Sequence, residues 1–235
     1  MSNRPYASLV GSLMYAQVCT RPDLAFAVSV LGRFQANPGE YHWTAAKKVV
    51  RYLQRTKSYM LVYGRIERLE VIGHCDSDFA GCEDDRRSTS GYVFLMAGCA
   101  ISWRSAKQKT LATSTMQAEY ISCFEATQQA MMLKNLISEM RIVDTIAKPL
   151  VIYCDNKAAV FFSKNNKKSY AARLMDVKYQ SVKEKVKAGM VSIEHIDTTL
   201  MLADPLTKLL AVGVFKNHVA NMGVVESFDS ATVWK

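Results

Sequence analysis

The feature of the sequence that most constrains the fold is a set of three strand patterns followed by one long helical pattern. Apolar runs at 69–75, 91–96 and 101–103 are joined by short polar loops, which predicts an antiparallel meander. Residues 113–140 have helical spacing, with Ser114 as the expected N-cap. Later runs at 150–154 and 191–196 alternate with helical segments, the last over about 205–219. This order predicts an α/β fold: a mixed five-stranded sheet, three antiparallel strands and then parallel ones, flanked by helices.

The first 65 residues have a different character and predict a small helical segment. Residues 24–34 and 42–55 have helical spacing on either side of the turn Asn37-Pro38-Gly39. This segment holds nine lysine and arginine residues against two acids, a net +7 of the chain's total +9. We therefore expect three parts: the helical segment over 1–65, a sheet domain over 66–222 and a tail over 223–235. The uneven charge indicates a polyanionic partner.

One helical pattern in this segment carries a basic face, made by Lys47, Lys48, Arg51 and Arg55 at three- and four-residue spacing. We call these four residues the basic face throughout. A solvated helix surface and a contact with phosphate groups explain it equally well.

Four acids stand near the ends of predicted elements. Asp76 follows the first strand, Glu119 lies in the first turns of the long helix, Asp155 follows the strand at 150–154, and Asp204 begins the last helix. If the first and fourth strands are neighbours, their ends bring Asp76 and Asp155 together. Each acid alone is more often a cap or a turn residue, and only the set of four indicates a site. Asp78 competes with Asp76 because both face the same side of a strand, and the strand end favours Asp76.

Carboxylates gathered in this way repel one another unless cations lie between them. Hard oxygen ligands select Mg²⁺ or Mn²⁺ over zinc. Two such ions can hold a phosphodiester for hydrolysis, with no side chain acting as a covalent nucleophile. We therefore expect two Mg²⁺ ions at this cluster.

The sequence gives no sign of secretion or of a membrane anchor. It contains no apolar run long enough to span a bilayer, and no signal-peptide core follows the N-terminus. The six cysteines are scattered without zinc-ligand spacing, which predicts free, mostly buried thiols in a reducing compartment.

Six motifs, in order over residues 70–210, resemble the ribonuclease H domain in the Pol polyprotein of copia-type long-terminal-repeat retrotransposons. They are DSDFAG at 76–81, DDRRSTSGY at 84–92, ISWRSAKQ at 101–108, STMQAEY at 114–120, CDNKAA at 154–159 and ADPLTK at 203–208. PYASLVGSLMY at 5–15 and TRPD at 20–23 resemble the C-terminal, thumb- or connection-like end of the reverse transcriptase that precedes this domain.

The resemblance implies a ribonuclease H-like fold and cleavage of the RNA strand of RNA–DNA hybrids during reverse transcription. It implies that Asp76, Glu119, Asp155 and Asp204 are both the catalytic residues and the ligands of two Mg²⁺ ions, for which Mn²⁺ can substitute. The implied partners are the hybrid and the rest of the polyprotein, with no membrane. The implied location is the cytoplasm, in a virus-like particle, or the nucleus.

Further residues are placed to contact nucleic acid besides the basic face. Arg104 and Lys107 follow the third predicted strand, and Asn156 and Lys157 follow Asp155. Asn156 serves equally well as a helix cap alone. We expect His195, on the last strand, to be a packed residue.

The chain also departs from the family pattern. Residues 173–176 read RLMD where the family usually has a Lys-His pair, residue 180 is Gln where His is common, and Met201 replaces Gln. These departures leave a second hypothesis open: a catalytically decayed or domesticated module, ribonuclease H-like in fold, that binds nucleic acid or another protein. A strand-transferring integrase is disfavoured, because its essential Glu would follow the fourth strand.

Overall fold

The computed structural model describes residues 4–64, 69–141, 143–165 and 177–227. Its helices are α1 (Tyr6–Thr20), α2 (Ala25–Gly32), α3 (Glu40–Arg55), α4 (Thr115–Met140), α5 (Lys157–Lys164), α7 (Ser181–Lys187) and α8 (Val212–Asn221). Its strands are β1 (Met60–Leu61), β2 (Ile72–Asp78), β3 (Thr89–Met96), β4 (Cys99–Lys107), β5 (Leu150–Cys154), β6 (Val191–His195) and β7 (Val224–Val225). Short 3-10 turns cover Pro22–Leu24, Asp144–Ala147, Val177–Gln180, Thr198–Leu200 and Asp204–Leu206.

The described strands form a central five-stranded sheet in the order β4-β3-β2-β5-β6. The pairs β2–β3 and β3–β4 are antiparallel, whereas β2–β5 and β5–β6 are parallel. The predicted fold class, a mixed ribonuclease H-like sheet flanked by helices, is therefore confirmed. His74 is level with Tyr153 across β2 and β5, so the same register carried two residues further sets Asp76 beside Asp155.

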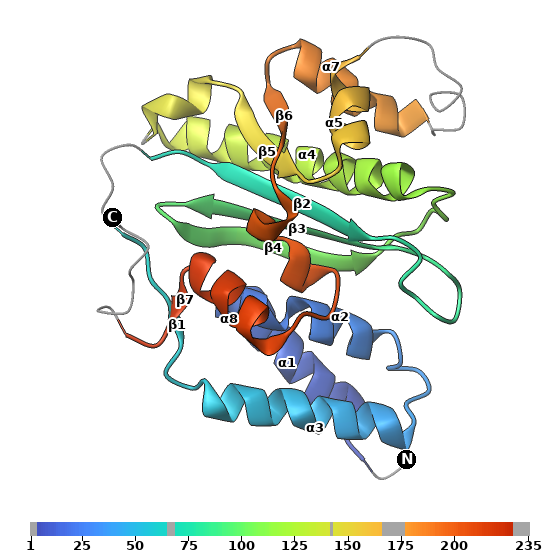
Figure 1. Ribbon diagram of the computed structural model, residues 1–235. Helices are drawn as coiled ribbons and strands as arrows, with labels where there is room; N and C mark the ends of the chain where they lie inside the picture. Colours follow the sequence, from blue (N-terminus) through green and yellow to red (C-terminus); the bar gives the residue numbers. More distant parts are fainter. Residues whose placement is uncertain (1–3, 65–68, 142, 166–176, 228–235) are drawn as a thin grey trace.

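Helices cover both faces of this sheet (Figure 1). The long helix α4 packs on β2, β3 and β5, with α5 and α7 beside it on the same face. Alternate residues of β3 serve the two faces: Phe94 lies in the core under α4, and Val93 packs with Leu206 and Met222 on the other face. Ser114 accepts a hydrogen bond from the backbone of Gln117, which confirms the predicted N-cap of α4.

The antiparallel strands are longer than the apolar runs predicted. β2 continues through Asp78 and β4 through Lys107, so Asp76 lies inside a strand rather than after it. Arg104 and Lys107 likewise lie within β4 and not behind it. The reason is that a buried strand can contain polar side chains when residues elsewhere in the chain form hydrogen bonds with them. Gln108 Nε2, for example, donates to a serine hydroxyl of β2 at 3.2 Å and to one of β3 at 2.8 Å.

The last predicted helix is two separate pieces. Asp204 begins a 3-10 turn that ends at Leu206, and α8 starts only at Val212. The turn ends because Thr207 bonds back to Asp204 and points its hydroxyl at Asp76 on β2. Asp204 is therefore the first residue of a short turn and not of a long helix.

The N-terminal segment folds as three helices around its own apolar cluster, which includes Tyr6, Val10, Leu13, Leu24, Val28, Leu31 and Ala46. A buried ion pair joins Arg21 to Asp23 at 2.7 Å, and Tyr52 donates a hydrogen bond to the same carboxylate. α2 lies against β4, and Ala25 belongs to the cluster on that face of the sheet. The helical segment therefore packs against the sheet through α2, whereas α3 packs on α1 and α2.

The expected tail differs from the structure at its start. Val224 and Val225 form β7, which pairs antiparallel with β1. Gly223 makes this approach possible, because its φ of +82° suits glycine and a Cβ there would lie 2.5 Å from the sulfur of Cys99. Residues 224–225 are thus tied to the segment at 60–61, and the division of the chain into domains remains a prediction. No helix among the described residues has the length and apolar character needed to cross a membrane.

Candidate active site

Carboxylates from four elements meet at one end of β2 and β5. Glu119 of α4 and Asp155, which follows β5, have carboxylate oxygens within 4.8 Å of each other. Asp76 and Asp204 are joined through one ammonium group: Lys208 Nζ lies 3.5 Å from Asp76 Oδ2 and 3.0 Å from Asp204 Oδ1. The charges of Asp76 and Asp155 act on both Glu119 and Asp204, so the two pairs are neighbours and the four carboxylates lie in one region.

Asp76 is held more firmly than an ordinary strand aspartate. It is 1% exposed, and its Oδ2 atom accepts a hydrogen bond from the hydroxyl of Thr207. Ser122 of α4 donates to its backbone oxygen at 2.7 Å. Gly91, opposite Asp76 on β3, leaves room for this contact, since a Cβ there would lie 2.7 Å from the methyl group of Thr207. Asp76 is thus held at its carboxylate by Thr207 and at its backbone by α4.

Burial and mutual repulsion make ionisation of these acids unfavourable. Burial first, and then the charges of Asp76 and Asp155, raise the pKa of Glu119 well above its usual range. Burial and Asp76 raise the pKa of Asp204 to about 6. Burial also raises the pKa of Asp76, although the charge of Lys208 opposes the effect. The cluster therefore carries an electrostatic penalty at neutral pH that a bound cation would relieve.

Lys208 is the basic side chain that partly offsets this penalty. Burial opposes its charge, yet the nearby carboxylates of Asp76 and Asp204 raise its pKa. Thr207 and Lys208 belong to the ADPLTK motif, but the sequence alone predicted no role for either residue. The four-residue spacing from Asp204 to Lys208 within a helical turn was the available indication, because such residues lie on one side of the turn.

Asp78 lies beside the cluster rather than within it. Its side chain is partly exposed, and burial and the charge of Asp76 raise its pKa. Asp76, by contrast, contacts Thr207 and Lys208 directly and interacts with Asp155. The geometry therefore favours Asp76 over Asp78 as the central carboxylate of β2.

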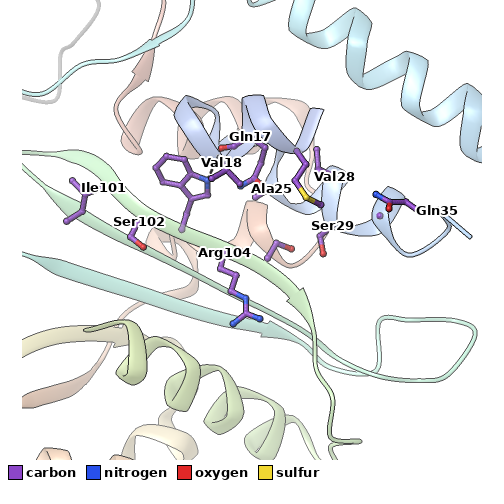
Figure 2. Close-up of a pocket in the computed structure, with 13 residues that line it drawn as sticks. Gln17, Val18, Ala25, Val28, Ser29, Gln35, Ile101, Ser102 and Arg104 are labelled. Atoms are coloured by element: carbon purple, nitrogen blue, oxygen red, sulfur yellow. Dashed lines mark hydrogen bonds between the residues drawn. The ribbon is translucent and has the colours of Figure 1, made fainter. Parts of the chain in front are cut away.

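The candidate phosphate contacts on β4 differ in their surroundings. Arg104 is exposed, and Figure 2 shows its side chain pointing away from α1 and α2. It lies near Tyr92 and Glu125, whose pKa values burial raises, and its charge opposes both shifts. Lys107 is engaged in an ion pair, with Nζ 2.7 Å from Asp85 in the loop between β2 and β3. Arg104 is thus the freer of the two cations to meet a ligand.

The residues after Asp155 begin a helix. Asn156 is the N-cap of α5, and its side-chain oxygen accepts a hydrogen bond from the backbone of Ala159 at 3.0 Å. The cap function is therefore present, while a contact with nucleic acid remains a prediction. Lys157 is exposed in the first turn of α5, next to the cluster in sequence.

The basic face lies on the exposed side of α3: Lys47, Lys48, Arg51 and Arg55 are all exposed, while the preceding Ala46 is buried. A cleft of about 280 Å³ lies between this helix and the segment that follows Asp204, and Lys48 and Lys208 both line it. Most of its other lining residues are apolar, and none of the four clustered carboxylates lines it.

A separate cleft of about 670 Å³ lies between β4 and the helices α1 and α2 (Figure 2). Gln17 and Val18 of α1, Val28 and Ser29 of α2, and Ser102 of β4 are among its lining residues. None of the four clustered carboxylates lines it. This cleft is therefore distinct from the candidate active site.

Three other features that the sequence analysis singled out are a histidine on the last strand, the departures from the family pattern and the cysteines. His195 is exposed at the end of β6 and is not packed, because the sheet edge leaves its side chain in solvent. Met201 is fully buried, and Leu174 lies outside the described residues. All six cysteines are free and five are buried, as expected, but three of them form a cluster that the scattered sequence positions did not indicate.

Comparisons with known proteins agree with the resemblance found in the sequence. No family model matches the chain. The Pol polyprotein from transposon TNT 1-94 of Nicotiana tabacum is 41% identical over 216 residues, which are 92% of this chain and 16% of that protein. The Pol polyprotein from transposon RE2 of Arabidopsis thaliana is 34% identical over 94% of this chain and 15% of its own length. The chain thus spans about one-sixth of these relatives.

A shorter relative and a solved structure are also similar. Secreted RxLR effector protein 161 of Plasmopara viticola is 50% identical over 133 residues, which are 57% of this chain and 94% of that protein. LC11-RNase H1, solved in complex with an RNA/DNA hybrid, is similar with a TM-score of 0.43 and 16% identity, over 59% of this chain and 94% of its own. Over nearly its whole length, the chain is therefore similar to one segment of the retrovirus-related Pol polyproteins of these plant transposons.

Proposed function

We propose that this chain is a metal-dependent endonuclease that cleaves the RNA strand of RNA–DNA hybrids during reverse transcription. The observation that carries the proposal is the convergence of Asp76, Glu119, Asp155 and Asp204 from four separate elements. The similarity to retrovirus-related Pol polyproteins supports it, because the resemblance implies reverse transcription. Reverse transcription leaves RNA–DNA hybrids whose RNA strand must be removed.

The donor set fits Mg²⁺, with Mn²⁺ as a substitute. The four side chains offer only hard carboxylate oxygens, which these ions prefer. Asp204 Oδ1 is buried and accepts no well-formed hydrogen bond, although Lys208 Nζ lies 3.0 Å away. Two bound Mg²⁺ ions would supply an activated water and charge stabilisation for the leaving oxygen.

The chain itself supplies position and charge. Thr207 and Ser122 fix Asp76 from both sides of β2, and Thr198 holds Asp155 by a hydrogen bond of 3.0 Å. Lys208 lowers the repulsion between Asp76 and Asp204 before any cation binds. No covalent intermediate with the protein is required, so the expected products are an RNA with a 3′-hydroxyl and a fragment with a 5′-phosphate.

The hybrid would lie across the cluster and extend toward α3. Lys48 and Lys208 line one cleft, so both could contact the phosphate backbone there. Arg104 and Lys157 are exposed and can add phosphate contacts. Lys107 could do the same only after its ion pair with Asp85 breaks. Discrimination of RNA from DNA would rest on 2′-hydroxyl contacts near Glu119 and Asn156.

The helical segment α1–α3 would be the end of the reverse transcriptase, and the remainder of the polyprotein would be its partner. Its packing against β4 supports this, since the two parts share the cluster that includes Ala25 and Val93. The proposed location is the cytoplasm, in a virus-like particle, or the nucleus.

A hybrid-cleavage assay with and without Mg²⁺ tests the proposal. The unmodified chain should cut the RNA strand only with Mg²⁺ or Mn²⁺. Asp155→Asn keeps the shape of the side chain but removes one ligand charge, so it should abolish cutting and leave hybrid affinity within a few-fold. Cleavage that survives in Asp155→Asn would remove this carboxylate from the mechanism.

A second candidate function is a binding module that no longer cuts. The observation that favours it is the similarity to secreted RxLR effector protein 161. The 133 residues that are 50% identical to this chain make up 94% of that protein, so in that relative the segment exists as a separate protein. The departures from the family pattern at Leu174 and Met201 point the same way. A chain that binds hybrid but never cuts it with either ion would favour this candidate.

A further inference from the structure

We propose that three thiols beneath the carboxylate cluster, Cys75, Cys123 and Cys154, form a second metal site, selective for thiophilic cations such as Zn²⁺ and Cd²⁺. Their sulfur atoms lie within 4.8 Å of one another. The Sγ atoms of Cys75 and Cys123 are 3.6 Å apart, and all three side chains are fully buried. The site is made of β2, α4 and β5, three elements that pack tightly in the core.

The sulfur positions suit a single ion. Zinc–sulfur bonds of about 2.3 Å place the sulfurs of a tetrahedral or trigonal site roughly 3.8–4.0 Å apart. The Cys75–Cys123 separation of 3.6 Å is within a few tenths of an ångström of that spacing. Small side-chain rotations would therefore be enough for three sulfurs to close on one ion.

A carboxylate is available as the fourth ligand. Glu119 Oε2 lies 3.8 Å from Cys154 Sγ, and donor atoms of Glu119, Cys154 and Asp155 all lie within 4.8 Å of one another. Zinc accepts three thiolates and one carboxylate in tetrahedral sites. Asp155 is partly exposed, so a cation can enter past it and reach the thiols through Glu119.

The arrangement follows from the chain itself, because each thiol accompanies one carboxylate. Cys75 precedes Asp76, Cys154 precedes Asp155, and Cys123 lies one helical turn after Glu119. The elements that gather the acids must therefore gather the thiols. Soft sulfur ligands below and hard oxygen ligands above select different ions, so Mg²⁺ should not displace the thiophilic ion.

Glu119 links the two sites. A thiophilic ion that recruits Glu119 removes one ligand from the Mg²⁺ cluster, so its binding should inhibit cleavage. This consequence, unlike the metal site itself, rests on the proposed nuclease function.

Cadmium is the probe that tests the site. The reduced full-length chain is titrated with Cd²⁺ in excess Mg²⁺, and ultraviolet thiolate-to-cadmium absorption is followed with the bound metal content. All variants carry Cys19→Ser, which removes the exposed thiol. We expect one tightly bound Cd²⁺ per chain, lost in Cys123→Ser and kept in Cys99→Ser. Cys99 is the matched control, since it is equally buried but lies against Gly223.

Near-ultraviolet circular dichroism identifies variants that fail to fold. If Cys123→Ser fails to fold, Cys154→Ser is used in its place. Glu119→Gln should weaken Cd²⁺ binding at least tenfold while the absorption band persists. The proposal would be overturned if the folded wild-type chain gave no charge-transfer band. It would also be overturned if the band survived both Cys123→Ser and Cys154→Ser. Hybrid cleavage is not the readout, so this result is independent of the nuclease test.

Discussion

Replacing Lys208 with Met should destabilise the protein in a way that depends on pH. The substitution keeps most of the side chain's apolar volume and removes the ammonium group that lies between Asp76 and Asp204. The two acids then face each other without a counter-charge. They can respond by taking up a proton, which limits the loss of stability.

The structure sets the size of the effect. Breaking a fully buried ion pair costs about 3–5 kcal/mol, and an exposed one contributes about 0–1 kcal/mol. The Lys208 side chain is 32% exposed while its partners are 2% and 7% exposed, so we expect a loss of about 2–3 kcal/mol at pH 7. Protonating Asp204, whose pKa is about 6, costs about 1.4 kcal/mol at pH 7, and the unpaired charge of Asp76 accounts for the rest of the loss. At pH 5 Asp204, with a pKa of about 6, is mostly protonated already, and the loss should fall below about 1 kcal/mol.

Urea unfolding at pH 5 and pH 7, without divalent cations, measures these values. Lys216→Met, an exposed lysine on α8, is the matched control and should change the unfolding free energy by less than about 0.5 kcal/mol. Added Mg²⁺ should recover more stability in Lys208→Met than in the wild type. An equal loss at both pH values would show that packing and not charge is responsible, and would refute the argument.

Three further results are expected. Without divalent cations, Asp204 should lower the free energy of unfolding by up to about 3 kcal/mol as pH rises from 4 to 6, because its raised pKa makes the folded state bind more protons there. Buried His74, whose pKa is lowered to about 4, acts in the opposite direction, so the Asp204 contribution is measured as the difference between the wild type and Asp204→Asn. Mg²⁺ should flatten this difference, and a difference that does not change with pH would contradict the argument. Gly91→Ala should cost about 1–3 kcal/mol in thermal or urea unfolding, since its Cβ would meet Thr207 at 2.7 Å, whereas Gly213→Ala, with open space around it, should be neutral or stabilising. Reversing the charges of the basic face should lower the slope of log affinity for hybrid against log salt by roughly 0.9 per lost phosphate contact, while Lys187→Glu on α7 should not.

Local patterns predicted those elements whose signals lie within the element itself. β5 has the predicted bounds, and α4 begins at the predicted cap, because an apolar run and a capping serine are read from neighbouring residues. The same holds for α2 and α3, the two helices of the N-terminal segment that were predicted with bounds. Their boundaries shift by only a few residues, since α3 begins at Glu40 instead of His42.

The details of the candidate site depend on contacts between distant residues, and these were harder to predict. The extension of β2 through Asp78 relies on pairing with β3, which an apolar count does not register. Lys208 joins the acids because a short turn folds onto β2, and the spacing from Asp204 to Lys208 does not by itself show where that turn packs. The thiol cluster was missed for the same reason: Cys75, Cys123 and Cys154 are near each other only after the sheet and α4 have packed.

The pairing of β1 with β7 has a consequence for how the chain folds as it is made. Val224 follows its partner Leu61 by 163 residues, so at synthesis rates of about 5–20 residues per second β1 waits roughly 10–30 s for its partner. During that time the amide of Val62, which donates to Gly223 in the finished molecule, has no acceptor there. On ribosome-bound chains that end before residue 223, this amide should exchange its hydrogen rapidly, and β1 should be an open edge for chaperones or neighbouring nascent chains.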